Sequence, residues 1–217
     1  MFKKITLDNG LRILTAPMQG TNTVTAFVMC DTGSDYEAKP ENGVSHFLEH
    51  MFFKGTKNRP SHDIIAHELD QMGSLSNAFT SHETTGYFIK AGALYAERAL
   101  DLLADIYKNS LLAEAEIERE KQVVIEELHV DHDTPTTYIW LLWEKLLYGD
   151  QPAGWEVGGD EATVRSFQRD GIAGYFTHQY VAKNTAVVVA GNFDEAKIVA
   201  LVKDLFADIR DGEPRGK

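Results

Sequence analysis

The chain has 217 residues, 43% hydrophobic and 25% charged, which is the composition of a globular domain and not of a disordered segment. Its 33 acidic and 21 basic residues give a formal net charge of −12, which argues against a nucleic-acid partner and an anionic membrane surface. The single cysteine, Cys30, excludes an intrachain disulfide. The start lacks the apolar stretch of a secretory signal, and no apolar run approaches the roughly 20 residues of a membrane span, so we expect a cytoplasmic protein.

The first part of the chain carries strand signals followed by helix signals. Asp8-Asn9-Gly10 stands between two short apolar runs, where an Asn-Gly pair predicts the turn of a β-hairpin. Residues 44–53 contain no Gly or Pro and predict a helix, with Asn42 or Ser45 as its cap. A second helix is expected over 62–72, and strands are expected over 23–29, 77–80 and 84–90.

The rest of the chain has mostly helical periodicity. Helices are expected over 93–108, 114–129, 136–147, 162–169, 172–179 and 195–209, and a strand over 185–190. Strands grouped in hairpins and helices grouped in runs predict an α+β fold, with a largely antiparallel β-sheet and helices packed on it. The tail after residue 211 is polar and contains Gly and Pro, as a linker or a frayed end does.

The most informative residues lie in the helix expected over 44–53. His46 and His50 are four residues apart, so a helix places both imidazoles on one face, where they can bind the same metal ion. Glu49 lies about 100° from His50 around the helix, close enough to reach a metal-bound water. His-x-x-Glu-His is the inverted zincin pattern. A solvated helix face with two surface histidines could have the same sequence. The neighbouring residues are mostly apolar, however, and predict a buried helix, on which these polar groups need a partner.

A catalytic zinc ion takes a third protein ligand and leaves one position open. The acidic helix expected over 114–129 holds the candidates. Glu120 and Glu127 are seven residues apart and share a face, whereas Glu126 turns about 100° away. Most acids on such a helix are solvated. Glu120 and Glu127 are therefore functional only if this helix packs beside the two histidines, which periodicity cannot show.

The segment from Gly43 to Thr56 resembles the signature of the pitrilysin/insulysin family of zinc metallopeptidases. Further similar segments are spread over nearly the whole chain: Asn9 to Arg12, Thr32 to Ser34 with Glu37, Asn77 to Thr80, Glu118 to Glu127, and Asn184 to Asn192. The resemblance implies one half of a two-half clamshell, a zinc-dependent endopeptidase that hydrolyses extended peptides or unfolded polypeptides. It also implies a second homologous domain or subunit as partner.

The resemblance implies a role for each residue of the site. His46, His50 and Glu127 match the zinc ligands. Glu126 is the alternative third ligand, because the spacing in the family varies by about one residue. Glu49 matches the base that activates the water, a role worth typically 10²–10⁴-fold in rate. Glu120 matches a second acidic residue, which supports a ligand.

The resemblance also implies a substrate strand and a domain boundary. Asn77, Ala78 and Phe79 match an edge strand that pairs with an extended peptide. Residues 1–211 would form the zinc-binding N-terminal domain, and residues 212–217 a polar tail or a linker to a second half. The chain alone is therefore expected to bind zinc but to cleave peptides poorly.

Two other functions fit part of the sequence. Asp31-Thr32-Gly33 also resembles the loop of aspartic proteases, which need two such Asp residues side by side, and a turn that ends a strand explains these residues better. The other alternative is a non-catalytic scaffold half of a peptidase complex. Such halves usually lose the metal residues, and here the His-x-x-Glu-His pattern is intact.

The remaining histidine, cysteine and tryptophan residues are expected to be structural or solvated. Residues 129–133 follow a helix end, where a His and Asp run is usually solvated. His62 and His67 are five residues apart and are expected to be exposed. Cys30 is expected to be a small buried residue. The three Trp residues, Trp140, Trp143 and Trp155, are expected in the core.

Overall fold

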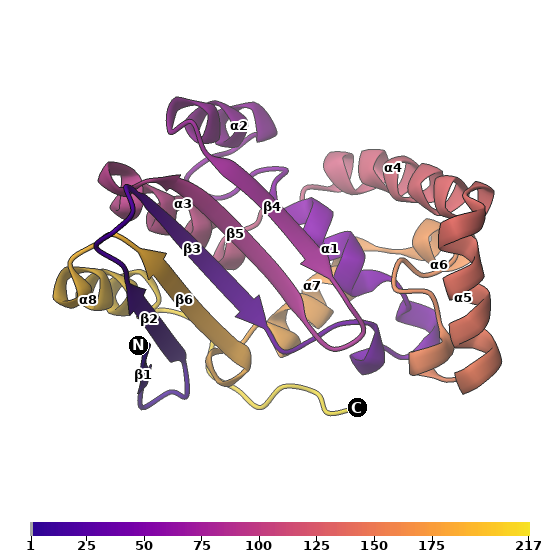
Figure 1. The fold of residues 1–217 in the computed structure, drawn as a ribbon. Helices are drawn as coiled ribbons and strands as arrows, with labels where there is room; N and C mark the ends of the chain where they lie inside the picture. The colour runs from indigo at the N-terminus through magenta and orange to yellow at the C-terminus, as the bar shows by residue number, and fades with distance from the viewer. Residues whose placement is uncertain (1) are drawn as a thin grey trace.

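The computed structural model describes residues 2–217, which form a six-stranded β-sheet with helices behind it and at one end (Figure 1). The strands are β1 Lys3–Thr6, β2 Arg12–Pro17, β3 Thr23–Cys30, β4 Leu75–Thr80, β5 Thr85–Gly92 and β6 Thr185–Gly191. The helices are α1 Val44–Phe52, α2 His62–Gln71, α3 Ala96–Lys108, α4 Glu114–Asp133, α5 Pro135–Tyr148, α6 Glu161–Ser166, α7 Arg169–Gln179 and α8 Glu195–Leu205. The expected α+β class is confirmed. Within the described part, none of the helices has the length and apolar character needed to cross a membrane.

The strand order in the sheet is β1-β2-β6-β3-β5-β4. All neighbouring strands are antiparallel except β2 and β6, which are parallel. The sheet is mixed because β6, from the last part of the chain, is inserted between β2 and β3. The strand β4 lies at one edge, so one side of its backbone has no neighbouring strand among the described residues.

The predicted amino-terminal hairpin is confirmed by the pairing of β1 with β2. Its turn is closed by a hydrogen bond of 2.9 Å from Gly10 N to Leu7 O. Gly10 has φ +89°, a left-handed conformation that favours glycine. Asn9 Oδ1 accepts from Leu11 N at 3.1 Å, which fixes the start of β2. The hairpin turn therefore lies where the Asn-Gly pair predicts it, with Gly10 alone of the pair in a left-handed conformation.

Helix α1 is held against the sheet by its apolar side. Its residues Phe47, Leu48, Met51 and Phe52 are buried. The ring of Phe52 stacks on Tyr87 of β5, with the ring centroids 5.0 Å apart. The same ring lies 5.2 Å from that of Tyr180, which follows α7. Burying several large side chains at about 1.5–3 kcal/mol each fixes the position of α1, and with it the polar residues on the opposite side.

The amino terminus of α1 is capped by Glu37, and not by Asn42 or Ser45 as expected. One carboxylate oxygen of Glu37 accepts from Gly43 N at 2.7 Å, and the other accepts from Ser45 N at 2.8 Å. Asn42 donates its amide to the same carboxylate at 3.0 Å. The prediction was wrong because it considered only residues next to the helix start, whereas the capping oxygens come from Glu37, six residues before Gly43. Glu37 is 4% exposed, so these backbone N–H groups are satisfied without water.

Helices α4 and α5 extend from the body at one end of the sheet (Figure 1). Helix α4 continues to Asp133, four residues beyond the expected end, and buries Ile117, Val124 and Leu128. Helix α5 has no buried residue. Trp140 is 65% exposed and Trp143 is 49% exposed, so the expectation that they lie in the core was wrong. Apolar residues surround most of α5, and a composition of this kind does not distinguish a core helix from an outer one.

The third tryptophan is also not a core residue. Trp155 is only partly buried, and its Nε1 donates to Asp150 Oδ1 at 2.8 Å. The ammonium group of Lys39 lies 4.4 Å from the centre of its ring. By contrast, Cys30 is buried, and His62 and His67 are exposed, as expected.

The last residues of the chain differ from the expected helix. Helix α8 ends at Leu205 because the residues after it form tight turns, with Ala207 N donating to Asp204 O at 3.3 Å. The tail contacts the body through Lys217, whose Nζ lies 3.1 Å from Asp35 Oδ2. The expectation that residues 212–217 are a tail or linker to a second half stays a prediction.

Candidate metal centre

Helix α1 presents two imidazoles side by side. His46 and His50 lie one turn apart, and their ring centroids are 4.8 Å apart at an angle of 79°. Both side chains are partly buried, 22% and 16% exposed. They lie on the side of α1 that faces α4. The predicted spacing therefore produces a pair of imidazoles that can contact one ion.

Helix α4 adds a carboxylate to this pair. Glu127 Oε2 lies 3.2 Å from His50 Nε2 and 3.7 Å from His46 Nε2. One possible ligand atom from each of the three residues lies within 4.8 Å of the others. Ligands about 2.1 Å from a tetrahedral zinc ion lie about 3.4 Å apart, which is close to the two distances from Glu127 to the histidines. Glu127, and not Glu126, belongs to this group, so the geometry favours Glu127 as the third candidate ligand.

Glu120 contacts His50 at the ring nitrogen that does not face Glu127. Its Oε2 lies 3.2 Å from His50 Nδ1, and its Oε1 lies 2.7 Å from Lys54 Nζ. The side chain is only 2% exposed. Burial alone would raise the pKa of Glu120, but the hydrogen bonds to His50 and Lys54 outweigh it, so the pKa is lowered. Glu120 therefore accepts hydrogen bonds as a carboxylate, and His50 can present Nε2 to an ion.

The two histidines differ in proton affinity. Burial, and then the nearby His50, lower the pKa of His46 to about 4. For His50, burial again lowers the pKa, but the hydrogen bond to Glu120 and the charge of Glu127 outweigh it, so the pKa is raised. His46 is therefore neutral near pH 7, the state in which an imidazole nitrogen can bind a metal.

The ring of His46 has one buried nitrogen without a partner among the described residues, Nδ1. This nitrogen faces Gly158, where an added Cβ would lie 3.5 Å from it and 2.9 Å from a methyl group of Leu128. A cavity of about 230 Å³ lies beside His46 and Glu127, and Thr80, Leu141 and Gly158 are among the residues that line it. The centre thus has open space on one side, as a site that takes a substrate requires.

Glu49 lies outside the group of three possible ligands. Its Oε2 accepts a hydrogen bond of 2.6 Å from Thr80 Oγ1, at the end of β4. Burial raises the pKa of Glu49, although the Thr80 hydrogen bond acts in the opposite direction. A carboxylate with a raised pKa, held beside possible metal ligands, is suited to accept a proton from water.

The predicted substrate strand is the edge strand β4. Asn77, Ala78 and Phe79 lie in its middle, and β4 pairs with β5 on its other side. The N–H group of Ala78 donates to its neighbour, Asn77 Oδ1, at 2.9 Å. The ring of Phe79 stacks on Phe27 with the centroids 6.1 Å apart. The location suits strand addition, while the role in substrate binding stays a prediction.

Sequence reasoning gave no role to two residues that touch this centre. Thr80 is the last residue of the edge strand and orients Glu49. Lys54 belongs to the same family-like segment as the histidines, directly after the expected helix, and pairs with Glu120. Their positions beside the motif could have marked them as candidates, but only the packing of α4 and β4 against α1 shows what they contact.

Comparison with known proteins identifies the family. Residues 12–150, which include every residue of the candidate centre, match the family described as Insulinase (Peptidase family M16). This chain belongs to the M16 peptidase family. Residues 166–217 match the Peptidase M16 inactive domain. The two matched parts share one sheet, because β6 of the second part lies between β2 and β3 of the first.

The M16 relatives include bacterial and mitochondrial proteins. An uncharacterized zinc protease of Rickettsia felis is 39% identical over 207 residues, which are 95% of this chain and 50% of that protein. The uncharacterized zinc protease YmxG of Bacillus subtilis is 37% identical over 100% of this chain and 52% of that protein. The human mitochondrial-processing peptidase subunit beta is 35% identical over 93% of this chain and 41% of that protein. The chain thus spans about half the length of the curated relatives that it matches.

Solved M16 structures share the fold over the whole chain. A protease from Helicobacter pylori superposes with a TM-score of 0.93 at 28% identity, covering 100% of this chain and 53% of that one. Pitrilysin superposes with a TM-score of 0.89 at 22% identity, covering 100% of this chain and 24% of that one, which shows the fold alone. The expected clamshell-half architecture is therefore that of these neighbours.

Proposed function

We propose that this chain is the zinc-binding half of an endopeptidase that hydrolyses extended peptides. The observation that carries the proposal is the convergence of His46, His50 and Glu127, with Glu127 Oε2 3.2 and 3.7 Å from the two Nε2 atoms. Zinc protease names among the relatives support the choice of metal. The donor set of two imidazoles and one carboxylate is one that catalytic zinc sites use.

Each side chain of the centre has a distinct task in this proposal. His46, His50 and Glu127 hold the zinc ion, which when bound would polarise the scissile carbonyl and make water more acidic. Glu49 takes a proton from water and gives it to the leaving amine. Thr80 holds one oxygen of Glu49 through a hydrogen bond of 2.6 Å, so the other oxygen is free for this transfer.

The edge strand β4 positions the peptide. A substrate strand that pairs with Asn77, Ala78 and Phe79 would use backbone hydrogen bonds, which depend little on side chains. The peptide would replace the local bond between Ala78 N and Asn77 Oδ1. Because Thr80 ends the same strand and contacts Glu49, this arrangement would bring the bound backbone to the centre.

The complete enzyme would need a second homologous half. The curated relatives are about twice as long as this chain, and one of them is named as a subunit. We therefore expect the chain alone to bind zinc and to cleave peptides slowly. The alternative, a non-catalytic partner half, predicts that Glu49 is dispensable in the assembled enzyme.

The test of the zinc site is the zinc stoichiometry of the purified chain. The purified chain should bind one zinc ion per molecule, and His46→Ala or His50→Ala should abolish this binding. His67→Ala, which changes an exposed histidine on α2, is the matched control and should bind zinc normally. Absence of zinc binding by the unaltered chain, or retention of it in both site variants, would overturn the proposal.

A further inference from the structure

A lysine, Lys54, is connected to the candidate metal centre through one intervening side chain, that of Glu120. Lys54 Nζ lies 2.7 Å from Glu120 Oε1, and the other oxygen of Glu120 lies 3.2 Å from His50 Nδ1. The three side chains therefore form a continuous path from lysine to carboxylate to imidazole. On the far side of the ring, His50 Nε2 faces Glu127 Oε2 at 3.2 Å.

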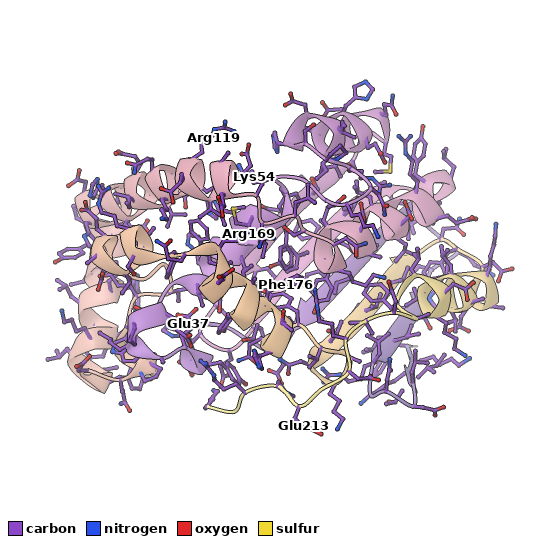
Figure 2. All side chains as sticks on the ribbon, turned by 180° about the vertical axis from the view of Figure 1, so that it is seen from behind. Glu37, Lys54, Arg119, Arg169, Phe176 and Glu213 are labelled. Carbon is purple, nitrogen blue, oxygen red and sulfur yellow. The ribbon has the colours of Figure 1, made fainter. Side chains whose placement is uncertain are left out.

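The fold brings Lys54 to this place from the end of α1. Lys54 lies two residues after the last residue of α1, and its backbone N donates to Met51 O at 3.1 Å. Figure 2 labels Lys54 beside the amino-terminal end of α4, the helix that carries Glu120. Lys54 is 23% exposed, whereas its partner Glu120 is 2% exposed. The lysine thus reaches inward to a buried carboxylate.

A buried carboxylate with only one partner would be costly. Two further carboxylates of the centre, Glu49 and Glu127, act on His50 together with Glu120. Without the ammonium group, Glu120 would either remain a buried charge with a single hydrogen bond or turn away from His50. Lys54 prevents both outcomes, because its ammonium group pairs with Glu120 Oε1 and Glu120 Oε2 stays directed at the His50 ring.

We propose that Lys54 is a positioning residue of this centre: it fixes the Glu120 carboxylate as the acceptor for His50 Nδ1–H, so that His50 presents Nε2 to the metal ion. This inference rests on the proposed zinc site. Among the described residues, the ion-pair partner of the Lys54 ammonium group is Glu120, and Lys54 is not one of the residues that line the cavity beside His46. It acts through Glu120, and its effect therefore depends on that residue.

The sign of the effect separates positioning from simple charge. A cation near a divalent metal ion repels it, so charge alone predicts that removing Lys54 strengthens zinc binding. Positioning predicts the opposite, because a ligand whose ring is no longer oriented binds the metal less well. Loss of a supporting hydrogen-bond partner of a metal ligand typically costs 10–100-fold in affinity.

The experiment measures zinc affinity of the metal-free chain by competition with a chromogenic chelator. We expect Lys54→Met and Lys54→Gln to weaken zinc binding about 10-fold, and Lys54→Arg to restore most of it. Lys57→Met is the matched control on an exposed lysine nearby and should bind zinc normally. Unfolding midpoints in chelator check that each variant is folded, and cobalt absorption bands report the ligand geometry directly.

A double variant tests whether Lys54 acts through Glu120. If it does, Lys54→Met combined with Glu120→Gln should bind zinc no more weakly than Glu120→Gln alone. Tighter or unchanged binding in both neutral variants, or losses that add in the double variant, would overturn the role of Lys54 while leaving the zinc site intact. Failure of the unaltered chain to bind zinc would overturn the zinc site itself, and the role of Lys54 with it.

Discussion

Replacement of Glu37 by Ala should destabilise the domain more than any surface acidic substitution. The change leaves Gly43 N–H and Ser45 N–H, now satisfied at 2.7 and 2.8 Å, without acceptors at the start of α1. A buried donor left unsatisfied costs about 1–3 kcal/mol, and removing a negative charge from a helix amino terminus adds about 0.3–1 kcal/mol. Removal of the buried carboxylate offsets part of this, since burial makes its charged form unfavourable. We expect a net loss of about 3 kcal/mol.

The assay is urea unfolding and thermal unfolding followed by circular dichroism at pH 7, in chelator so that metal binding does not contribute. For a domain of this size, about 3 kcal/mol corresponds to a fall of about 6–12 °C in Tm. Glu126→Ala is the control, because Glu126 is exposed on α4; it should cost about 0.5 kcal/mol or less. A loss below about 1 kcal/mol for Glu37→Ala would show that the cap does not hold α1.

The same residue gives a pH dependence with a defined sign. Burial raises the pKa of Glu37, although hydrogen bonds from Ser45, Gly43 and Asn42 act in the opposite direction. The folded state therefore binds the proton more tightly than the unfolded state. This contribution to stability is fully present below the unfolded pKa and is lost as the pH rises through the folded pKa. The stability of the unaltered chain relative to Glu37→Gln should be greater at pH 4 than at pH 7, and an opposite trend would contradict the raised pKa.

Three further variants test the candidate centre and its support. Glu127→Gln should weaken zinc binding at least about 100-fold in a chelator competition, whereas Glu126→Gln should leave it unchanged; equal losses would contradict the choice of ligand. Glu49→Gln should keep zinc bound but abolish peptide turnover in the enzyme assembled with its second half, and surviving turnover would favour the scaffold alternative. Gly43→Ala should lower the unfolding midpoint, because Gly43 has φ +94° and an added Cβ would lie 2.4 Å from Gly158 O; an unchanged midpoint would show that this contact yields easily.

The local parts of the fold were predictable because local chemistry determines them. The Asn9-Gly10 turn and the ends of α2 follow from residues adjacent in sequence: Ser61, directly before α2, caps it by accepting from Ile64 N at 3.4 Å. The cap of α1 could not be predicted in this way, since its acceptor, Glu37, lies six residues before Gly43. The position of β6 between β2 and β3 was also out of reach, because it depends on pairing between distant segments.

For the candidate centre too, the features set by local sequence were predictable and those set by packing between helices were not. The spacing of His46 and His50 follows from helix geometry and was readable from sequence. The packing of α4 against α1 determines that Glu127, and not Glu126, lies beside the histidines. Sequence periodicity cannot predict this packing. Trp140 and Trp143 were misplaced because an apolar helix without its neighbours gives no indication of which side is covered.

The inserted strand β6 also has a consequence for synthesis on the ribosome. Every side chain proposed to hold the metal ion lies between His46 and Glu127, so all of them leave the exit tunnel well before β6 is made. Until β6 arrives, β2 and β3 have no strand between them, and the sheet on which α1 packs is incomplete. We therefore expect a nascent chain that stops before residue 185 to bind zinc weakly and to depend on chaperones, with metal capture following completion of the sheet.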